Sequence, residues 1–372
     1  MSSPAAAAEV SVAFGTPAIV VDLARPAGAD LGPSGPAGGS GPAGASGPAG
    51  LSGAGPGAVS PPRGLPGPPG FSWAGPDTVA RPPGLAVVVV GVHPGGLGAV
   101  PAGLAGLADV VVADPGPVLA TVEAAPQASV TLALVLRAAG ALGVAEALAV
   151  ESAAYSTLQS GAEFARWRAG RVSAGADGRA VATEAGAGAT PGPAVLVERA
   201  GADLHITLNR PERHNAVDVA LRDELVEALT VACADPSIER VVLAGAGPSF
   251  CSGGDLAEFG SRPDPATAHL VRLTRSPARL LAELGPRLEA RLHGACIGAG
   301  IEMAAFAGRV VARPDTLMSL PELRLGLIPG AGGTVSLPRR IGRHRTAELA
   351  LTATPLEAAT ALAWGLVDAV EP

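Results

Sequence analysis

From about residue 194 onward, short apolar runs alternate with longer segments of helical periodicity. Residues 194–199 and 203–209 are two such runs joined by an Ala-Gly-Ala-Asp turn, which predicts a β-hairpin. Residues 240–245 have the pattern of a buried strand, and residues 218–234 have the spacing of a helix. Because strands that alternate with helices pack as sheets covered by helices, this part of the chain predicts an α/β fold.

Further elements are expected on both sides of these. Downstream, the patterns predict a helix over 267–284, a strand over 287–295, a short helix over 300–307 and a strand over 309–312. Upstream, a buried-strand pattern at 85–90 precedes three helical patterns, over 116–125, 129–141 and 144–168. The segment 84–170 is therefore expected to be mainly helical.

Glycine and proline divide the chain into these parts. Of 372 residues, 51 are Gly and 36 are Pro, and residues 1–80 consist mostly of these two with Ala and Ser. Such a segment buries too little apolar surface to offset the loss of chain entropy, so we expect a disordered N-terminus. Glycine recurs at every third position over 32–54, as in collagen, but the short block indicates a flexible linker. A second linker is expected over 171–193, ahead of a core at 194–372.

Charge and cysteine content argue against several classes of function. The net charge is −7 and the chain has no lysine, which gives no electrostatic basis for binding nucleic acid or an anionic membrane. The three cysteines, Cys233, Cys251 and Cys296, lack metal-site spacing, so no metal is expected, and they fit a reducing compartment. The sequence shows no signal-peptide pattern and no apolar run long enough to span a bilayer. We therefore expect a cytoplasmic protein.

Two glutamates, Glu302 and Glu322, each lie beside glycines. Glu302 is about one turn into the short helix expected after Gly298-Ala299-Gly300, and Glu322 stands in a Leu-Pro-Glu loop. A helix N-terminus has unpaired N–H groups that stabilise a negative oxygen, and glycine lets a ligand approach the backbone. The Gly-Gly-Asp turn at 253–255 offers a second set of such groups. Each feature alone is common in ordinary packing, but together they predict proton transfer beside a stabilised oxyanion.

The order of these features resembles the crotonase superfamily, the enoyl-CoA hydratase/isomerase family, from about residue 195 to residue 372. Five motifs carry the resemblance in order: an Arg-Pro and Asn-Ala loop at 209–217, the loops at 250–256 and 298–302, a Leu-Pro-Glu to Gly-Gly-Thr stretch at 320–334, and Trp-Gly-Leu-Val-Asp at 364–368. The resemblance implies an α/β fold of the crotonase type. In that fold, strand-strand-helix repeats form a spiral with two near-perpendicular sheets wrapped by helices.

The resemblance also implies a role for each of four residues. The N–H groups of Gly254 and Ala299 would form an oxyanion hole for the thioester oxygen. Glu302 and Glu322 match the two glutamates of enoyl-CoA hydratases, with Glu302 orienting and activating a water and Glu322 exchanging the proton of the α-carbon. An apolar surrounding would raise the pKa of a carboxyl group there towards neutrality.

Coenzyme A would enter as part of the substrate, and no permanently bound cofactor is expected. The resemblance places the CoA portion against two loops, at Arg213, Asn215, Ala216, Cys251, Gly253, Asp255 and Leu256. Family members often use lysines around the phosphates, which this chain lacks. Arg213, Arg339, Arg340 and Arg343 are candidates to replace them, and an ordinary surface role is equally compatible with each.

The favoured function is therefore reversible hydration of a 2-enoyl-CoA to a 3-hydroxyacyl-CoA, a lyase reaction of fatty-acid and lipid metabolism. One alternative is a Δ3,Δ2-enoyl-CoA isomerase, which needs one acid/base and no bound water. Another is a non-catalytic crotonase-like module that binds acyl-CoA or acts structurally. The resemblance further implies a homo-oligomer, either a trimer or a hexamer.

Part of the N-terminal half is also similar to the family. Residues 106–111, Gly-Leu-Ala-Asp-Val-Val, look like residues 365–370, Gly-Leu-Val-Asp-Ala-Val, and helices that resemble the family's terminal helices follow them. Residues 84–170 could be a rearranged terminal segment, as in a circular permutation, or a decayed first copy; chance similarity between Ala- and Leu-rich helices is the third explanation. Either of the first two predicts that helices at 129–168 pack beside the end of a helix at 346–363 or on a neighbouring subunit.

Overall fold

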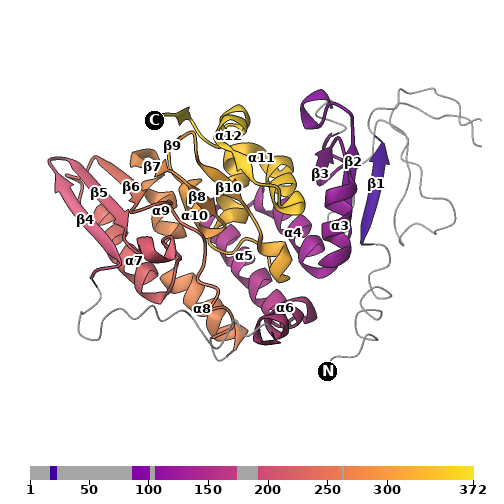
Figure 1. The fold of residues 1–372 in the computed structure, drawn as a ribbon, viewed down its shortest axis with the longest axis horizontal. Helices are drawn as coiled ribbons and strands as arrows, with labels where there is room; N and C mark the ends of the chain where they lie inside the picture. Colours follow the sequence, from indigo (N-terminus) through magenta and orange to yellow (C-terminus); the bar gives the residue numbers. More distant parts are fainter. Residues whose placement is uncertain (1–16, 23–85, 101–104, 174–191, 262–263) are drawn as a thin grey trace, which may run out of the picture.

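The computed structural model of the chain describes residues 17–22, 86–100, 105–173, 192–261 and 264–372. Most of the predicted N-terminal low-complexity region and of the linker at 171–193 lies outside these ranges. Within them, strands and helices alternate as predicted for an α/β protein (Figure 1).

The largest sheet has six strands in the order β12-β9-β7-β6-β5-β4. Their bounds are β4 (Val195–Ala200), β5 (Asp203–Leu208), β6 (Arg240–Gly245), β7 (Leu288–Leu292), β9 (Arg309–Ala312) and β12 (Ala369–Val370). β4 and β5 form the predicted antiparallel hairpin, and every other pairing is parallel. A second, three-stranded sheet consists of β8 (Ala295–Ile297), β10 (Leu317–Ser319) and β11 (Leu356–Glu357).

Two predicted elements of this half are each split in two. The helix expected over 267–284 is α8 (Pro265–Arg275) followed by α9 (Ala278–Leu284), because Pro277 cannot donate a backbone hydrogen bond and begins a new helix. The strand expected over 287–295 is β7 followed by β8. Between them Gly294 has a φ of +54°, a conformation that favours glycine.

The remaining helices of this half are α7 (Val219–Ala234), α10 (Ala299–Ala304), α11 (Gly333–Thr352) and α12 (Ala358–Trp364). Short 3-10 turns are η2 (Pro211–Arg213), η3 (Gly285–Arg287) and η4 (Glu322–Leu325). The predicted helices at 218–234 and 300–307 thus correspond to α7 and α10. The buried side chains of α7, including Leu221, Leu225 and Leu229, join one large apolar core.

The N-terminal segment contains strands as well as the predicted helices. β1 (Ala18–Asp22), β2 (Val88–Val92) and β3 (Val110–Val112) form a parallel sheet, accompanied by η1 (Leu97–Ala99). Four helices follow: α3 (Gly116–Ala124), α4 (Pro126–Ala139), α5 (Val144–Gln159) and α6 (Ala162–Ser173). The single helix expected over 144–168 is therefore two helices, which meet at Ser160 and Gly161.

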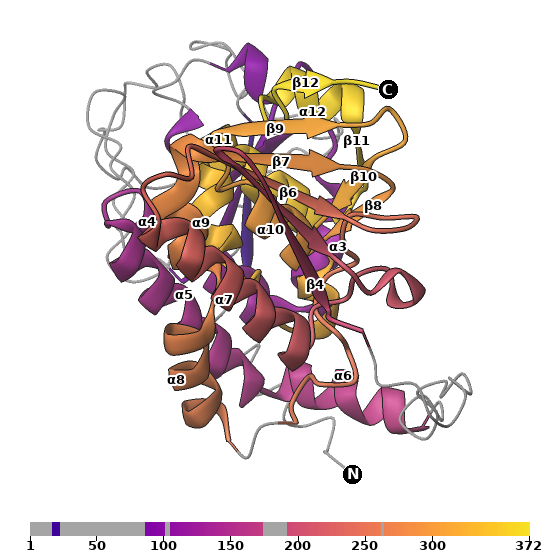
Figure 2. The ribbon, with the colours of Figure 1, turned by 90° about the vertical axis from the view of Figure 1, so that its left-hand side faces the viewer.

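These N-terminal helices lie against the C-terminal half. α3, α4 and α5 all contact α11, and α5 also packs along α8, as Figure 2 shows. Buried Leu132, Leu136 and Phe164 belong to the same apolar core as the C-terminal helices. α4 and α5 are thus placed beside α11, on the same chain. The helix expected over 346–363 is not a single element, because α11 ends at Thr352 and α12 begins at Ala358.

Two aspartates, Asp109 and Asp368, occupy equivalent places in the two similar Gly-Leu motifs. The N–H of Asp109 donates to the carbonyl of Val89, and the N–H of Val89 donates back to the carboxylate of Asp109, each at 2.8 Å. The same pair of bonds, each at 2.7 Å, joins Asp368 to Val310. The similarity of the two motifs in sequence is thus accompanied by the same local hydrogen bonding.

Both motifs are also held by arginines. Arg137 pairs with Asp109 at 2.7 Å, and Arg343 of α11 donates to the carbonyl of Ala108 at 2.9 Å. Arg340 of the same helix pairs with Asp368 and donates to the carbonyl of Leu366 at 2.7 Å. α11 therefore lies between the two motifs and contacts each of them.

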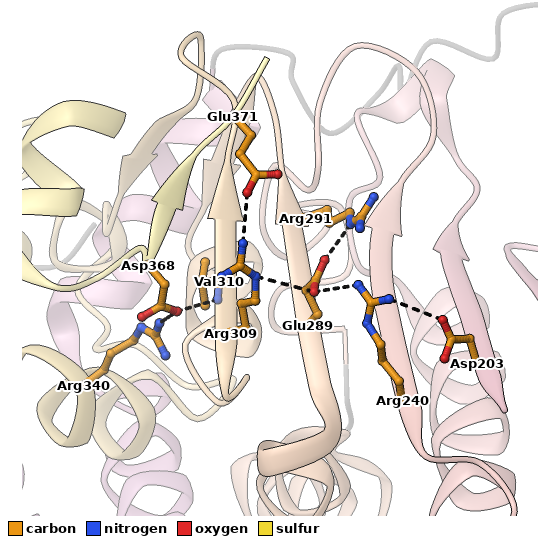
Figure 3. Close-up of polar contacts among 9 residues, drawn as sticks. All are labelled: Asp203, Arg240, Glu289, Arg291, Arg309, Val310, Arg340, Asp368 and Glu371. Carbon is orange, nitrogen blue, oxygen red and sulfur yellow. Dashed lines mark hydrogen bonds and ion pairs between the residues drawn. The ribbon is translucent and has the colours of Figure 1, made fainter.

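The large sheet carries a chain of charged side chains across its strands (Figure 3). Glu289 of β7 is buried and pairs with Arg240 of β6 at 2.7 Å and with Arg291 at 2.7 Å. Arg309 of β9, directly opposite Glu289 in the ladder, lies 3.6 Å from it. Opposite charges facing each other on neighbouring strands stabilise the pairing of those strands.

Among the described helices, none is by itself long and apolar enough to cross a membrane. α3 and α4 reach that length and composition only as a pair, which is bent by 112°.

Candidate active site

Glu302 lies in the first turn of α10, which begins at Ala299 after Gly298. Gly298 has a φ of +50°, which lets the chain turn sharply from β8 into this short helix. The Glu302 side chain is buried, and its Oε2 accepts hydrogen bonds from the N–H groups of Ala331 at 2.7 Å and Gly333 at 2.9 Å. One oxygen of the carboxyl group is thus fixed by backbone, which orients the other.

Glu322 begins the turn η4, directly after Pro321. Its side chain is also buried, and its Oε2 has no hydrogen-bond partner among the residues that the structure describes. Its Oε1 lies so close to Gly298 that a Cβ atom there would be 2.4 Å away. A buried oxygen without a donor is costly unless water or a ligand reaches it, so Glu322 is placed to act on a bound molecule.

The loops that carry Gly254 and Ala299 lie side by side. In the first loop, the backbone of Cys251 pairs with that of Cys296 of β8 in an isolated β-bridge, and both cysteines are free thiols. A Cβ at Gly253 would lie 3.1 Å from the carbonyl oxygen of Ile297. Gly253 itself has a φ of +98°. Within the described ranges, neither the N–H of Gly254 nor that of Ala299 has an acceptor. The two predicted oxyanion donors are therefore both available.

One cleft brings all four predicted catalytic residues together. It encloses a cavity of about 230 Å³. From the sequence-based set it is lined by Glu302, Glu322, Gly254, Ala299 and Asp255. The remaining wall comes from α5, α7, α8 and the loops at 258–261 and 330–331, including Tyr155, Gln159, Arg222 and Arg272.

The carboxyl groups of this cleft are shifted towards protonation. Burial raises the pKa of Glu322 to about 8, and nearby Glu151 adds to the shift. Burial, together with the charges of Glu322 and Glu151, holds the pKa of Glu302 well above its ordinary value, although the N–H groups of Ala331 and Gly333 oppose the shift. Carboxyl groups tuned in this way can donate or accept a proton near neutral pH.

Glu151, which the sequence did not single out as a site residue, binds the same turn as Glu302. Its carboxylate accepts from the N–H of Gly332 at 2.8 Å and from the N–H and hydroxyl of Thr334 at 2.9 and 2.7 Å. Burial raises the pKa of Glu151 to about 7, against the effect of these bonds. Residues 331–334 thus give alternate N–H groups to the two carboxyl groups.

The residues predicted to contact CoA are mostly outside the cleft. Asn215 is buried, with its side-chain amide bound to the carbonyls of Ala246, Ser249 and Phe250, so it fixes the loop at 246–250. Burial raises the pKa of the Cys251 thiol to about 12, which keeps it protonated and suits a packing role. Ala216, Gly253 and Leu256 do not line the cleft.

The arginines considered for the phosphates divide into two groups. Arg213 pairs at 3.0 Å with Asp255, which lines the cleft, and keeps 39% of its side chain exposed. Arg339 donates to the carbonyls of Val335 and Leu142. Arg340 and Arg343 hold the two aspartate motifs described above, so these three have internal roles.

No group of three or more His, Cys, Asp or Glu side chains in the described ranges is arranged to hold a metal ion. The acid/base candidates of the cleft are carboxyl groups, flanked by the hydroxyl of Tyr155 and the guanidinium group of Arg272.

Comparisons with known proteins find similar proteins for about half of the chain. Residues 198–372 match the family model of enoyl-CoA hydratase/isomerase. The enoyl-CoA isomerase/hydratase fer4 of Mycosarcoma maydis is 35% identical over 181 residues, which are 45% of this chain and 65% of that protein. The chain therefore spans less than two thirds of this curated relative.

Similar solved structures include two enoyl-CoA hydratases. Enoyl-CoA hydratase from Thermoplasma volcanium GSS1 is 34% identical over 48% of this chain and 72% of that chain, with a TM-score of 0.45. Enoyl-CoA hydratase from Bacillus anthracis is 33% identical over 48% of this chain and 70% of that chain, also with a TM-score of 0.45.

Proposed function

The chain belongs, through residues 198–372, to the enoyl-CoA hydratase/isomerase family and its crotonase-type α/β fold, and from this premise we propose that it catalyses the reversible hydration of a 2-enoyl-CoA. The observation that carries the proposal is the pair Glu302 and Glu322. Both carboxyl groups are buried in one cleft, beside two N–H groups without acceptors. Hydration needs two positioned acid/base groups and a site for the thioester oxyanion.

The chemistry follows from the position of each group. The thioester carbonyl oxygen lies between the N–H groups of Gly254 and Ala299, which stabilise the enolate as it forms. The oxygen of a water held by Glu302 forms a bond to the β-carbon, and one proton of that water passes to the carboxylate. The Oε2 of Glu322, which lacks a partner in the described ranges, carries the proton that passes to the α-carbon. The product is a 3-hydroxyacyl-CoA, and the reverse sequence dehydrates it.

The raised pKa of Glu322 supports its role as the acid. With the pKa of Glu322 at about 8, its carboxyl group is largely protonated at neutral pH and can act as the acid. Because the two groups lie in one low-dielectric cleft, charging either one makes charging the other less favourable. Their titration belongs to the pair, so the pH–rate profile is expected to be bell-shaped.

The direct test is hydration of crotonyl-CoA, followed by loss of absorbance of the conjugated thioester. Glu322→Gln is expected to lower turnover by at least about 100-fold, because an amide cannot supply the α-proton. Glu283→Gln, an exposed glutamate of α9, is the matched control and should retain full turnover. Near-native turnover of Glu322→Gln with an unchanged melting temperature would remove the assignment.

Isomerisation of a 3-enoyl-CoA is the second candidate, because the similar protein of Mycosarcoma maydis is named for both isomerase and hydratase activity. A single acid/base that moves a proton from the α-carbon to the γ-carbon suffices for that reaction. The same protein is assayed with a 3-enoyl-CoA. Turnover that needs Glu322 but tolerates Glu302→Gln would favour the isomerase over the hydratase.

We further propose that residues 84–170 act as the terminal helical layer of the fold, joined at the other end of the chain. Support comes from the contacts of α3, α4 and α5 with α11 and from the matching hydrogen bonds of Asp109 and Asp368.

The expected assembly is a homotrimer or hexamer. Light scattering coupled to size-exclusion chromatography measures that mass directly, and a monomer at micromolar concentration would contradict it.

A further inference from the structure

The wall of the cleft between α5 and α8 is polar. Arg272, on α8, lines the cleft together with Tyr155 and Gln159 of α5. The Arg272 guanidinium carbon lies 4.5 Å from the centroid of the Tyr155 ring, so the cation stacks on the aromatic face. An acyl chain that extends along this wall meets hydrogen-bond donors as well as apolar side chains.

Arg272 has only neutral partners within the described part of the chain. Its N–H groups donate to the hydroxyls of Ser152 and Ser156, to the side-chain oxygen of Gln159 at 3.3 Å and to the carbonyl of Ser152 at 3.4 Å. No carboxylate of the described residues lies within ion-pair distance of it. A partly buried guanidinium without a counter-charge is uncommon, because desolvating a cation is costly unless an anion compensates.

Tyr155 supplies a second donor at the same place. Its ring packs against the backbone of Gly330, where a Cβ atom would lie 2.3 Å from the ring. The glycine therefore lets the ring come in beside the catalytic loops. Tyr155 itself lines the cleft, together with Arg272. Arg272 thus brings a cation and Tyr155 an O–H group to this wall of the cleft. No carboxylate of the described residues forms an ion pair with Arg272.

We propose that this wall binds a carboxylate carried by the acyl group of the substrate. The preferred substrate is then a 2-enoyl-CoA whose acyl chain ends in a carboxylate. Arg272 provides the counter-charge and Tyr155 a hydrogen bond to the carboxylate. The inference deepens the proposed function, on which it rests, by naming the acyl group that the site selects.

The acidic groups that face this wall are neutralised or bound to donors, so they repel a further carboxylate only weakly. Glu302 and Glu322 are held towards their neutral forms by burial. Asp255 is paired with Arg213 at 3.0 Å, and Glu258 accepts from the N–H of Val219 at 3.2 Å. Glu151 accepts from three donors of the turn at 331–334, and its charge also acts on Arg272, although the two are not within ion-pair distance. Arg272 therefore remains the cation of this wall with no acid bound to it.

The alternative is that Arg272 only ties α5 to α8 through the two serines. That role predicts lower stability without any change in substrate preference when Arg272 is replaced. Carboxylate binding predicts a change of preference that depends on the charge of the acyl group. Probes that match in length and differ only in that charge therefore separate the two.

Binding is measured first, because it does not depend on turnover. Isothermal titration compares glutaryl-CoA with pentanoyl-CoA, whose acyl groups have the same number of carbons. The intact protein is expected to bind glutaryl-CoA about 10- to 100-fold more tightly, the usual range for hydrogen bonds to a charged group. Arg272→Met should abolish this preference, and Tyr155→Phe, which keeps the ring on Gly330, should reduce it about 3- to 10-fold.

Turnover is then compared for glutaconyl-CoA and 2-pentenoyl-CoA. Arg272→Met should lower kcat/KM for glutaconyl-CoA selectively, while Arg275→Met, an exposed arginine of the same helix, should change neither substrate. Equal affinity of the intact protein for glutaryl-CoA and pentanoyl-CoA would overturn the inference, as would a preference that survives Arg272→Met. Selective binding of glutaryl-CoA without turnover of any enoyl-CoA would instead overturn the proposed hydratase function.

Discussion

Glu151 and Glu302 accept hydrogen bonds from alternate N–H groups of a single turn. Ala331 and Gly333 donate to Glu302, whereas Gly332 and Thr334 donate to Glu151. The two glutamates come from helices α5 and α10, which belong to different halves of the chain. The position of the catalytic candidate Glu302 is therefore tied, through four consecutive residues, to a side chain of the N-terminal segment.

The first prediction concerns Glu151. In Glu151→Gln, an NH2 group replaces one acceptor oxygen, so one N–H of the turn loses its partner and the turn shifts. We expect kcat to fall about ten-fold or more and KM to stay nearly unchanged. A small displacement of a catalytic group is enough to lower the rate by such a factor. The double variant with Glu302→Gln should be no slower than Glu302→Gln alone, because the effect acts through Glu302. Additive losses in steady-state kinetics would contradict this, and Glu146→Gln on the exposed face of α5 is the control.

The second prediction concerns the contact between Gly298 and Glu322. In Gly298→Ala the new Cβ would lie 2.4 Å from Oε1 of Glu322, and alanine also disfavours the φ of +50°. We expect turnover to fall by at least about ten-fold as the carboxyl group moves aside. Gly365→Ala, at a φ of +78° with open space around it, shows the effect of backbone strain alone. Equal activity of the two variants would show that Glu322 does not depend on this approach.

The third prediction is that the protein loses stability as pH rises from ~4.5 to about 8. Glu151 and Glu322 have folded-state pKa values of about 7 and about 8, raised by burial, and that of Glu302 is raised as well. The folded state thus binds more protons than the unfolded state above pH ~4.5, so its stability falls as pH rises through these values. Urea unfolding across this range should show the decline, and Glu322→Gln should flatten it. A flat profile of the unaltered protein would contradict the shifts.

The fourth prediction concerns Glu289, whose contribution to stability should depend on pH in the opposite direction. Burial would raise the pKa of Glu289, but hydrogen bonds from Arg240 and Arg291 outweigh it and hold that pKa below its ordinary value. The stability that the ionised Glu289 contributes to the folded state is present above its unfolded-state pKa and is lost as pH falls through its folded-state pKa. Glu289→Gln should therefore cost about 1 kcal/mol or less at neutral pH, since the arginines are partly exposed, and almost nothing in acid. A cost that persists in acid would point to packing instead.

Sequence patterns located most elements of the C-terminal half because the signals there are local. The turn at 201–202 and the apolar run at 240–245 define β4, β5 and β6 within a residue or so. The predicted helix over 267–284 is longer than either observed helix, because the apolar spacing continues across Pro277, where α8 and α9 are separated. In the N-terminal segment, β1 pairs with β2, which lies far along the chain, so no local pattern indicates this pairing.

For the site, the glycine-rich loops indicated Glu302, Glu322, Gly254 and Ala299, and the structure brings these four into one cleft. Glu151, Tyr155 and Arg272 were missed. Their spacing on α5 and α8 is that of ordinary amphipathic helices, and only tertiary packing brings them to the cleft. The side-chain amide of Asn215 binds three carbonyl groups of the protein, and the contact of CoA with the backbone of its loop stays a prediction.

The contribution of α5 to the cleft has a consequence for biosynthesis. A ribosome makes a chain from its N-terminus, so Glu151 and Tyr155 emerge before any of the loops with which they pack. Until α8, α9 and α11 have been made, α5 has only α4 and α6 among its native helix neighbours. Nascent chains halted before α11 should therefore be more open to proteolysis at α5 than the finished protein.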